Sequence, residues 1–185
     1  MNLSTDRLNL RYITIDDLDQ VHALHIIPET DTYNTQGIPA NIDESKAILQ
    51  AWLDTLGKTA HIFLIETKEN DFVGFTGMKL GKANYRNAEL WYKLHINHWN
   101  KGYATEVVNE LMRVGFEDLQ LHRIDAGCAV GNIASAKVMQ KAGMLHEGRK
   151  RKVLPIRGEW VDGDTYAILE EDYFSRKNSQ LNNLK

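Results

Sequence analysis

A glycine-centred segment from His98 to Glu106 joins a strand pattern directly to a helix pattern. Residues 89–96 alternate in character as in a strand, and beyond the segment apolar residues recur on one helix face, at Val107, Val108, Leu111, Met112 and Phe116. The first N–H groups of a helix carry partial positive charge, which favours bound anions. Because Gly102 allows close approach to the backbone and Ala104 is small, the junction predicts an anion site. A junction that binds nothing is the alternative.

A second strand pattern followed by a helix pattern lies downstream. Residues 123–130 alternate like a strand, and the stretch from Asn132 to Gly143 is typical of a helix. Asn132 is a favourable N-cap, and Gly143 stands where a C-cap glycine is expected. Ser135 follows Asn132 by three residues, so we expect both side chains on neighbouring faces near the start of this helix.

Together these two segments resemble the GNAT superfamily of acetyl-CoA-dependent N-acetyltransferases. They are most similar to its RimJ/RimL-like branch, the ribosomal-protein alanine and serine N-acetyltransferases. The resemblance covers nearly the whole chain, from Leu8 to Tyr173. It implies an α/β fold in which a single GNAT-type domain, residues 1–174, holds a mixed central sheet of about seven strands flanked by about four helices.

The strand and helix patterns follow the order that the resemblance implies. Besides the helices described above, helices are expected from about Ile15 to Leu24, capped by Thr14, and through Leu56 with Asp43 as the cap. The polar residues 175–185 predict a flexible C-terminal tail. Alternation predicts strands over residues 8–12, 61–67, 72–80, 89–96, 123–130, 145–153 and 160–169.

Composition limits the classes of partner. A formal net charge of −3 argues against general nucleic-acid binding, which needs a basic face. The basic run at residues 149–152 favours a solvated strand end over an anion site. The single cysteine, Cys128, can form no internal disulfide, and its place on an apolar strand face favours packing over nucleophilic chemistry. Without a signal peptide or a membrane-spanning apolar run, a cytoplasmic protein with no membrane partner is expected.

The resemblance implies where acetyl-CoA, as co-substrate, would bind. The pantetheine arm would pair with the backbone of the strand at Leu94 and Ile96, whose main chain would also supply a donor to the thioester oxygen. Asn132 and Ser135 match the family positions that reach the pantetheine and the thiol. The diphosphate would rest beside Asn100 on the backbone amides of Lys101, Gly102, Tyr103, Ala104 and Thr105.

Two side chains are the candidates for acid–base catalysis. Many superfamily members place a tyrosine seven residues after the capping asparagine to protonate the leaving thiolate, but this chain has Met139 there. In the RimJ/RimL-like branch a serine near the helix start replaces it, so Ser135 is the candidate acid, with helix capping or cofactor positioning as the alternative. Glu89 is the candidate base, with binding of the substrate's charge as the alternative. Glu106 is the second candidate base, although the helix dipole alone explains a carboxylate there.

The amine acceptor is left open by the sequence. The resemblance implies direct attack in a ternary complex, with a protein N-terminal alanine or serine as one acceptor and a polyamine, amino acid or amino-sugar antibiotic as rivals. Where relatives often carry glycine, this chain has Trp91, which would narrow the amine pocket or simply join the core. A non-catalytic acyl-CoA-binding module is the alternative from another class. The histidines lack metal-ligand spacing, so no metal is expected, and the protein would be a monomer or a homodimer.

Overall fold

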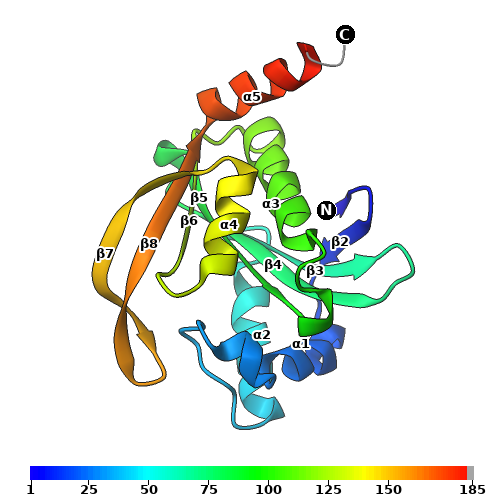
Figure 1. Ribbon diagram of the computed structural model, residues 1–185. Helices are drawn as coiled ribbons and strands as arrows, with labels where there is room; N and C mark the ends of the chain where they lie inside the picture. Colours follow the sequence, from blue (N-terminus) through cyan, green and yellow to red (C-terminus); the bar gives the residue numbers. More distant parts are fainter. Residues whose placement is uncertain (183–185) are drawn as a thin grey trace.

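Residues 1–182 are described by the computed structural model of this chain, and they form one mixed sheet with helices on both faces (Figure 1). The strand order is β1-β2-β3-β4-β5-β6-β8-β7, and every neighbouring pair is antiparallel except β5 and β6. The strands are β1 (Asn2–Ser4), β2 (Leu8–Tyr12), β3 (Ala60–Thr67), β4 (Phe72–Leu80), β5 (Asn87–Leu94), β6 (Arg123–Ala129), β7 (Leu145–Ile156) and β8 (Glu159–Leu169).

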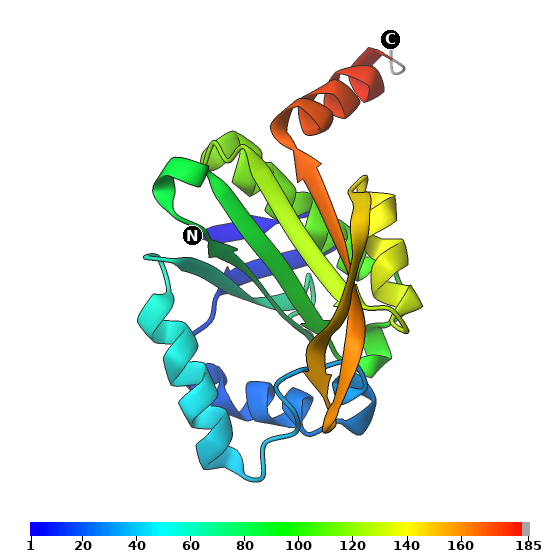
Figure 2. The same cartoon turned by 90° about the vertical axis from the view of Figure 1, so that its left-hand side faces the viewer.

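Two helical layers enclose the sheet (Figure 2). One face buries an apolar cluster against the first two helices, and the other face buries a larger cluster against the next two. These two clusters explain why neighbouring residues of β3, such as Ile62 and Phe63, are both buried although they point to opposite faces. The helices are α1 (Leu18–His25), α2 (Ile42–Thr55), α3 (Tyr103–Arg113), α4 (Ile133–Ala142) and α5 (Glu170–Asn182).

The parallel pair at the centre of the sheet is short. β5 and β6 pair only from Asn87 with Arg123 to Glu89 with Asp125, after which no further β5 residue pairs with β6. The N–H of His95 donates to Val73 of β4, so residues 91, 93 and 95 turn their backbone groups toward β4. Alternation therefore turns the backbone groups of residues 90, 92 and 94 toward the opening between β5 and β6.

Some element boundaries differ from those that the sequence predicts. The strand expected to reach Ile96 ends at Leu94, and a 3-10 turn covers Ile96–His98. The helix expected to begin with Asp43 as its cap is instead capped by Asn41, whose side chain accepts a hydrogen bond from the Glu44 N–H at 3.0 Å. The first expected helix begins with a 3-10 turn over Ile15–Asp17, and β1 was not expected.

The tail expected to be flexible forms a helix as far as it is described. α5 continues directly from β8 and extends away from the sheet (Figure 1). Tyr173 and Lys177 both contact the Glu117 carboxylate, each at 2.5 Å, and Arg176 donates to the Ala142 carbonyl. Acidic residues in its first turn also favour the helix start. The sequence did not predict this helix over residues 175–182, because the contacts that stabilise it are tertiary, and the flexibility of the segment stays a prediction; residues 183–185 lie outside the described part.

None of the helices in the described part of the chain is long and apolar enough to cross a membrane.

Candidate active site

The anion site predicted from the sequence lies at the start of α3. Gly102 caps this helix in the left-handed conformation, with φ +81°, and Asn100 is also left-handed, with φ +59°. The first bond of the helix runs from the Glu106 N–H to the Gly102 carbonyl at 3.1 Å. The preceding N–H groups, those of residues 103–105, therefore have no acceptor within the helix. This concave set of amides fits a diphosphate group.

Arg7 holds this loop from the start of β2. Its guanidinium donates to the Lys101 carbonyl at 2.9 Å and lies 4.7 Å from the centre of the Tyr103 ring. The Glu106 carboxylate accepts from the Thr5 hydroxyl at 2.6 Å and from the Arg7 Nε at 2.7 Å. Burial alone would raise the pKa of Glu106, but these hydrogen bonds outweigh it and hold the pKa below its usual value. Glu106 is therefore a structural anchor of the loop, and its role as the second candidate base is not supported.

A small cavity occupies the opening where β5 and β6 diverge. Its volume is about 150 Å³, and it reaches both walls of the opening and the start of α4. The site therefore combines a loop with free backbone amides at a helix start and an opening in the sheet. The cavity is lined by Tyr33, Leu90, Trp91, Tyr92, Ala126, Gly127, Cys128, Ala129, Asn132, Ser135 and Met139.

The backbone groups at the end of β5 are already partly used. The Trp99 indole N–H donates to the Leu94 carbonyl at 2.8 Å, and the Trp99 backbone N–H donates to the Ile96 carbonyl at 3.1 Å. The N–H groups of Leu94 and Ile96 carry no such bond, whereas each of the two carbonyls has one lone pair left to accept a further hydrogen bond. Leu90 and Tyr92 turn further backbone groups toward the same opening, and the sequence alone did not single these out.

Ser135 lies at the cavity in the first turn of α4. The Asn132 side chain accepts a hydrogen bond from the Ser135 N–H at 3.1 Å, so Asn132 is the N-cap that the sequence predicts. The Ser135 hydroxyl lies 2.9 Å from the Tyr92 hydroxyl, which comes from β5 on the opposite wall. Burial raises the pKa of Tyr92 to about 12, so this phenol stays protonated at neutral pH.

Two further residues that line the cavity, Met139 and Cys128, are buried packing residues. Met139 is buried on α4 at the position where many relatives carry tyrosine. Cys128 is buried on β6, and burial raises the pKa of its thiol to about 11. A thiol that stays protonated at neutral pH is a poor nucleophile, which agrees with the packing role that the sequence favours.

Glu89 lies at the closed end of the opening. It is an exposed residue of β5, faces the α1–α2 side of the sheet, and pairs in register with Asp125 of β6 and Lys79 of β4. It is not among the residues that line the cavity. An amine that reached the cavity from the α1–α2 side would pass this carboxylate, so its role as base stays a prediction.

Trp91 occupies both of the places considered for it. Its ring lies 5.3 Å from that of Trp52 and 6.0 Å from that of Phe75, so it belongs to the cluster under α1 and α2. It also lines the cavity. Gly77, its partner on β4, makes this possible, because a Cβ at Gly77 would lie 2.7 Å from the indole ring. Trp91 is therefore a fixed wall between the core and the cavity.

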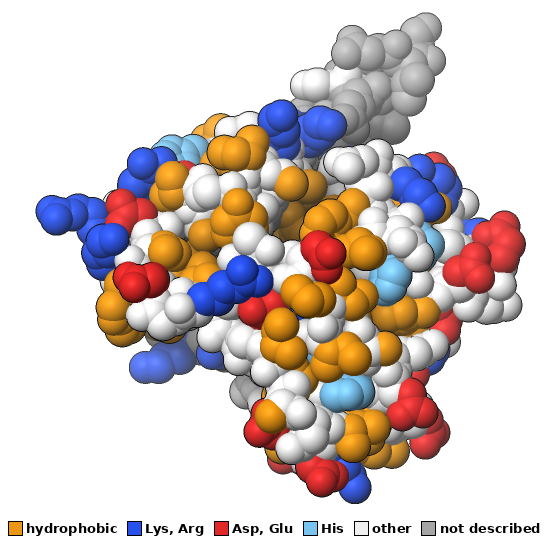
Figure 3. Space-filling model, turned by 60° about the horizontal axis from the view of Figure 1, so that its bottom comes forward, with side chains coloured by type: hydrophobic (Ala, Val, Ile, Leu, Met, Phe, Trp, Pro, Cys, Tyr) orange, Lys and Arg blue, Asp and Glu red, His pale blue; other side chains and the backbone are white. Residues whose placement is uncertain are grey.

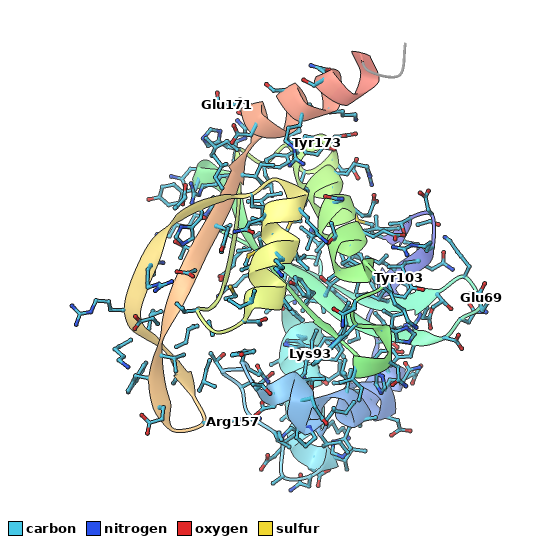
Figure 4. All side chains as sticks on the ribbon, viewed as in Figure 1. Glu69, Lys93, Tyr103, Arg157, Glu171 and Tyr173 are labelled. Carbon is cyan, nitrogen blue, oxygen red and sulfur yellow. The ribbon has the colours of Figure 1, made fainter. Side chains whose placement is uncertain are left out.

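Trp91 lies on the α1–α2 side of the sheet. Seen from below, apolar side chains gather near the middle of the molecule and charged side chains lie mainly around its rim (Figure 3). Arg157, at the tip of the β7–β8 hairpin, reaches the loop after α1 (Figure 4). Its Nη2 donates to the Pro28 carbonyl at 3.1 Å, and its Nε lies 3.6 Å from Oδ2 of the buried Asp31. Two loops far apart in sequence are thus joined over this side.

Lys93 lies near the middle of the molecule (Figure 4), close enough to that loop for the Asp31 charge to act on its pKa. Its Nζ is buried and has no hydrogen-bond partner among the described residues, and burial lowers its pKa to about 8, with Asp31 partly opposing the shift. His25 nearby is buried too, and burial together with the Lys93 charge lowers its pKa to about 4.

Replacing Lys93 by methionine is expected to raise the free energy of unfolding at pH 7 by about 1–2 kcal/mol, because it removes a poorly solvated charge. In the natural chain the folded state loses this proton near pH 8 and the unfolded state near the ordinary lysine pKa of 10.5. The unfolded state binds more protons between these values, so stability should rise with pH across that window. The free energy of unfolding, measured with urea at several pH values, should rise with pH in the natural chain and should not show this rise in Lys93→Met. An unchanged rise in the variant would contradict this assignment.

The arrangement of an amide-rich helix start beside an opened parallel strand pair matches a known family. Residues 7–145 match the family described as "Acetyltransferase (GNAT) domain". The chain belongs to this GNAT family. It is an N-acetyltransferase that uses acetyl-CoA.

Individual relatives agree on the family and differ in the acceptor that their names give. The chain is 31% identical over 176 residues to "Uncharacterized N-acetyltransferase YnaD" of Bacillus subtilis, covering 94% of this chain and 99% of that protein. The structure of spermidine N-acetyltransferase from Vibrio cholerae in complex with CoA and spermine matches with a TM-score of 0.82 at 22% identity, covering 92% of this chain and 99% of that one. "Putative ribosomal N-acetyltransferase YdaF" of B. subtilis is 33% identical over 92 residues, 50% of each chain.

The comparisons confirm the superfamily that the sequence predicts, but not the RimJ/RimL-like branch, since the ribosomal relative matches only half of the chain. The mixed α/β sheet is also confirmed, with eight strands in the described part rather than about seven. Within residues 1–182, no three His, Cys, Asp or Glu side chains are grouped so that they could hold a metal ion.

Sequence reasoning missed two polar residues at this site. Tyr92 was not singled out, although its hydroxyl alternates with the apolar Leu90 and Leu94 along the strand and so indicated a buried polar partner. Arg7 gave no signal, because its contacts with Lys101 and Glu106 cross about half of the chain.

Proposed function

We propose that this enzyme transfers the acetyl group of acetyl-CoA to the primary amine of a small molecule, by direct attack within a ternary complex. The bridge from Arg157 to Pro28 and Asp31 is the observation that carries the choice of acceptor. In this proposal the joined loops restrict access for a protein N-terminus, whereas a small amine needs only the space beside Trp91 and Tyr33, which both line the cavity.

In this proposal the chain supplies binding, orientation and proton transfer. The loop at residues 100–105 holds the diphosphate, and the backbone groups of β5 orient the pantetheine arm. Glu89 takes the proton from the incoming ammonium group, directly or through water, so that the nitrogen lone pair can attack. Ser135 donates a hydrogen bond to the sulfur. Acetyl-CoA supplies the activated acyl group.

A protein N-terminus is the second candidate acceptor. The partial match to the relative named as a putative ribosomal N-acetyltransferase favours it. The likeness to the spermidine acetyltransferase, at 22% identity, speaks for the fold and not for the substrate, so it does not choose between the two acceptors.

A thiol-release assay with acetyl-CoA separates these acceptors. The panel would contain monoamines, polyamines, amino acids, amino sugars, and peptides beginning with Ala or Ser. We expect turnover with small amines and little with peptides. Arg157→Ala should open the bridge and raise kcat/KM for peptides about tenfold, with small-amine turnover changed less than about twofold.

Arg151→Ala, on the same hairpin, is the matched control, since Arg151 is exposed on β7 and forms no part of the bridge. If the natural enzyme prefers a peptide, the small-molecule acceptor is wrong and the protein N-terminus takes its place.

A further inference from the structure

Two hydroxyl groups from opposite walls of the cavity meet at hydrogen-bond distance. The Tyr92 hydroxyl, from β5, lies 2.9 Å from the Ser135 hydroxyl, from α4, and both side chains line the cavity. The two residues are 43 positions apart in sequence and are brought together by the divergence of β5 from β6. Tyr92 thus places a phenol at the same cavity as Met139, from the strand wall rather than from the helix.

The direction of the hydrogen bond between these two hydroxyls decides whether Ser135 still has a proton to donate to another atom. A serine hydroxyl has one proton to donate and two lone pairs. If Tyr92 donates to Ser135, the serine proton is free to point to a third atom in the cavity; if Ser135 donates to Tyr92, it is not. The first arrangement is the stronger one, since a phenol is a better donor than an aliphatic hydroxyl. Because burial raises the pKa of Tyr92 to about 12, the phenol keeps its proton over the working pH range.

We propose that Tyr92 is a positioning residue for acetyl transfer, which orients the Ser135 hydroxyl so that its proton points to the sulfur of the departing CoA. As the bond from the acetyl carbon to sulfur breaks, its electron pair goes to sulfur, and the Ser135 O–H donates a hydrogen bond to the thiolate. Neither hydroxyl gives up its proton. The ammonium nitrogen gives one proton to the base before it attacks and a second to solvent water as the tetrahedral intermediate collapses. The thiolate takes one proton back from solvent on release, and the base returns its own, so that one proton is released in total. This inference rests on the role proposed above for Ser135.

Tyr92→Phe is the test, because it keeps the ring and removes only the hydroxyl. We expect kcat to fall about tenfold, with KM for acetyl-CoA changed less than about twofold. In a Ser135→Ala background Tyr92→Phe should cost almost nothing further, since it has no hydroxyl left to orient. Ser135→Thr should recover activity and its dependence on Tyr92. Tyr12→Phe is the matched control, because Tyr12 also bonds a side chain, His61, at 2.6 Å, but lies on β2.

A binding measurement without any amine separates this inference from the acceptor. Acetyl-CoA has no free thiol, so the ratio of its Kd to that of CoA isolates binding of the thiolate. In the natural enzyme the Kd of acetyl-CoA divided by the Kd of CoA should increase from about pH 7 to pH 9, because the CoA thiolate binds more tightly than the thiol. In Tyr92→Phe the increase in this ratio should be about tenfold smaller.

Each outcome has one meaning. If Ser135→Ala keeps full activity, the proposed role of Ser135 fails, and this inference fails with it. If Ser135→Ala is impaired but Tyr92→Phe matches the natural enzyme in kcat and in the CoA ratio, only the role of Tyr92 is overturned. Additive losses in the double variant would also overturn it, because they would assign Tyr92 a purely structural effect.

Discussion

Replacing Glu89 by glutamine is expected to lower kcat by about 10²–10³-fold, since general-base catalysis contributes on this order. Glutamine keeps the size and polarity of the side chain but cannot take a proton. Glu89 is exposed on the α1–α2 side of the sheet and does not line the cavity, so the affinity for CoA should change less than about twofold. Steady-state thiol release gives kcat, and calorimetric titration gives the Kd of CoA.

The matched control is Glu69→Gln, an exposed glutamate on the turn between β3 and β4 (Figure 4). It should behave like the natural enzyme. If Glu89 instead binds the positive charge of the acceptor, Glu89→Gln is predicted to raise KM for the amine and to leave kcat nearly constant. Full activity of Glu89→Gln would remove Glu89 from the mechanism altogether.

Replacing Gly102 by valine is expected to raise KM for acetyl-CoA about 10–100-fold. Gly102 has φ +81°, a conformation that costs a β-branched residue on the order of 1–2 kcal/mol. Its new Cβ would lie 3.4 Å from Arg7 Nη2, an ordinary contact, so the effect is expected from backbone strain at the amides proposed to hold the diphosphate. The KM should be measured for two acetyl donors, acetyl-CoA and acetyl-pantetheine, of which the second lacks the diphosphate. KM should rise for acetyl-CoA alone.

Gly57→Val is the control for strain without a binding site. Gly57 has φ +72°, and a Cβ there would meet no atom within 4 Å. It should lower stability by a similar amount and leave KM for acetyl-CoA unchanged. An equal rise of KM for both donors in Gly102→Val would mean that the fold of the loop is damaged rather than its contact with the diphosphate.

The ends of the two helices at the site could be predicted because their signals are local. Gly102 and Gly143 both adopt the left-handed conformation that glycine favours, and Asn132 caps α4 through a bond to a residue three positions away. The same local reasoning placed the cap of α2 two residues too late and missed the helix at the C-terminus. Asn41 and Asp43 are both good caps, so composition could not choose between them.

The sequence by itself determined the superfamily, the glycine-containing loop that leads into α3 and the helix that carries Ser135, since each depends on residues within a few positions of one another. Only the tertiary structure decided which side chains contact each other. Tyr92 meets Ser135, Trp91 lies over Gly77, and Arg157 joins the hairpin to the loop at Asp31. These contacts depend on strand register and on where β5 leaves β6. A shift of one residue would turn each side chain to the other face of the sheet, and no local pattern fixes that choice.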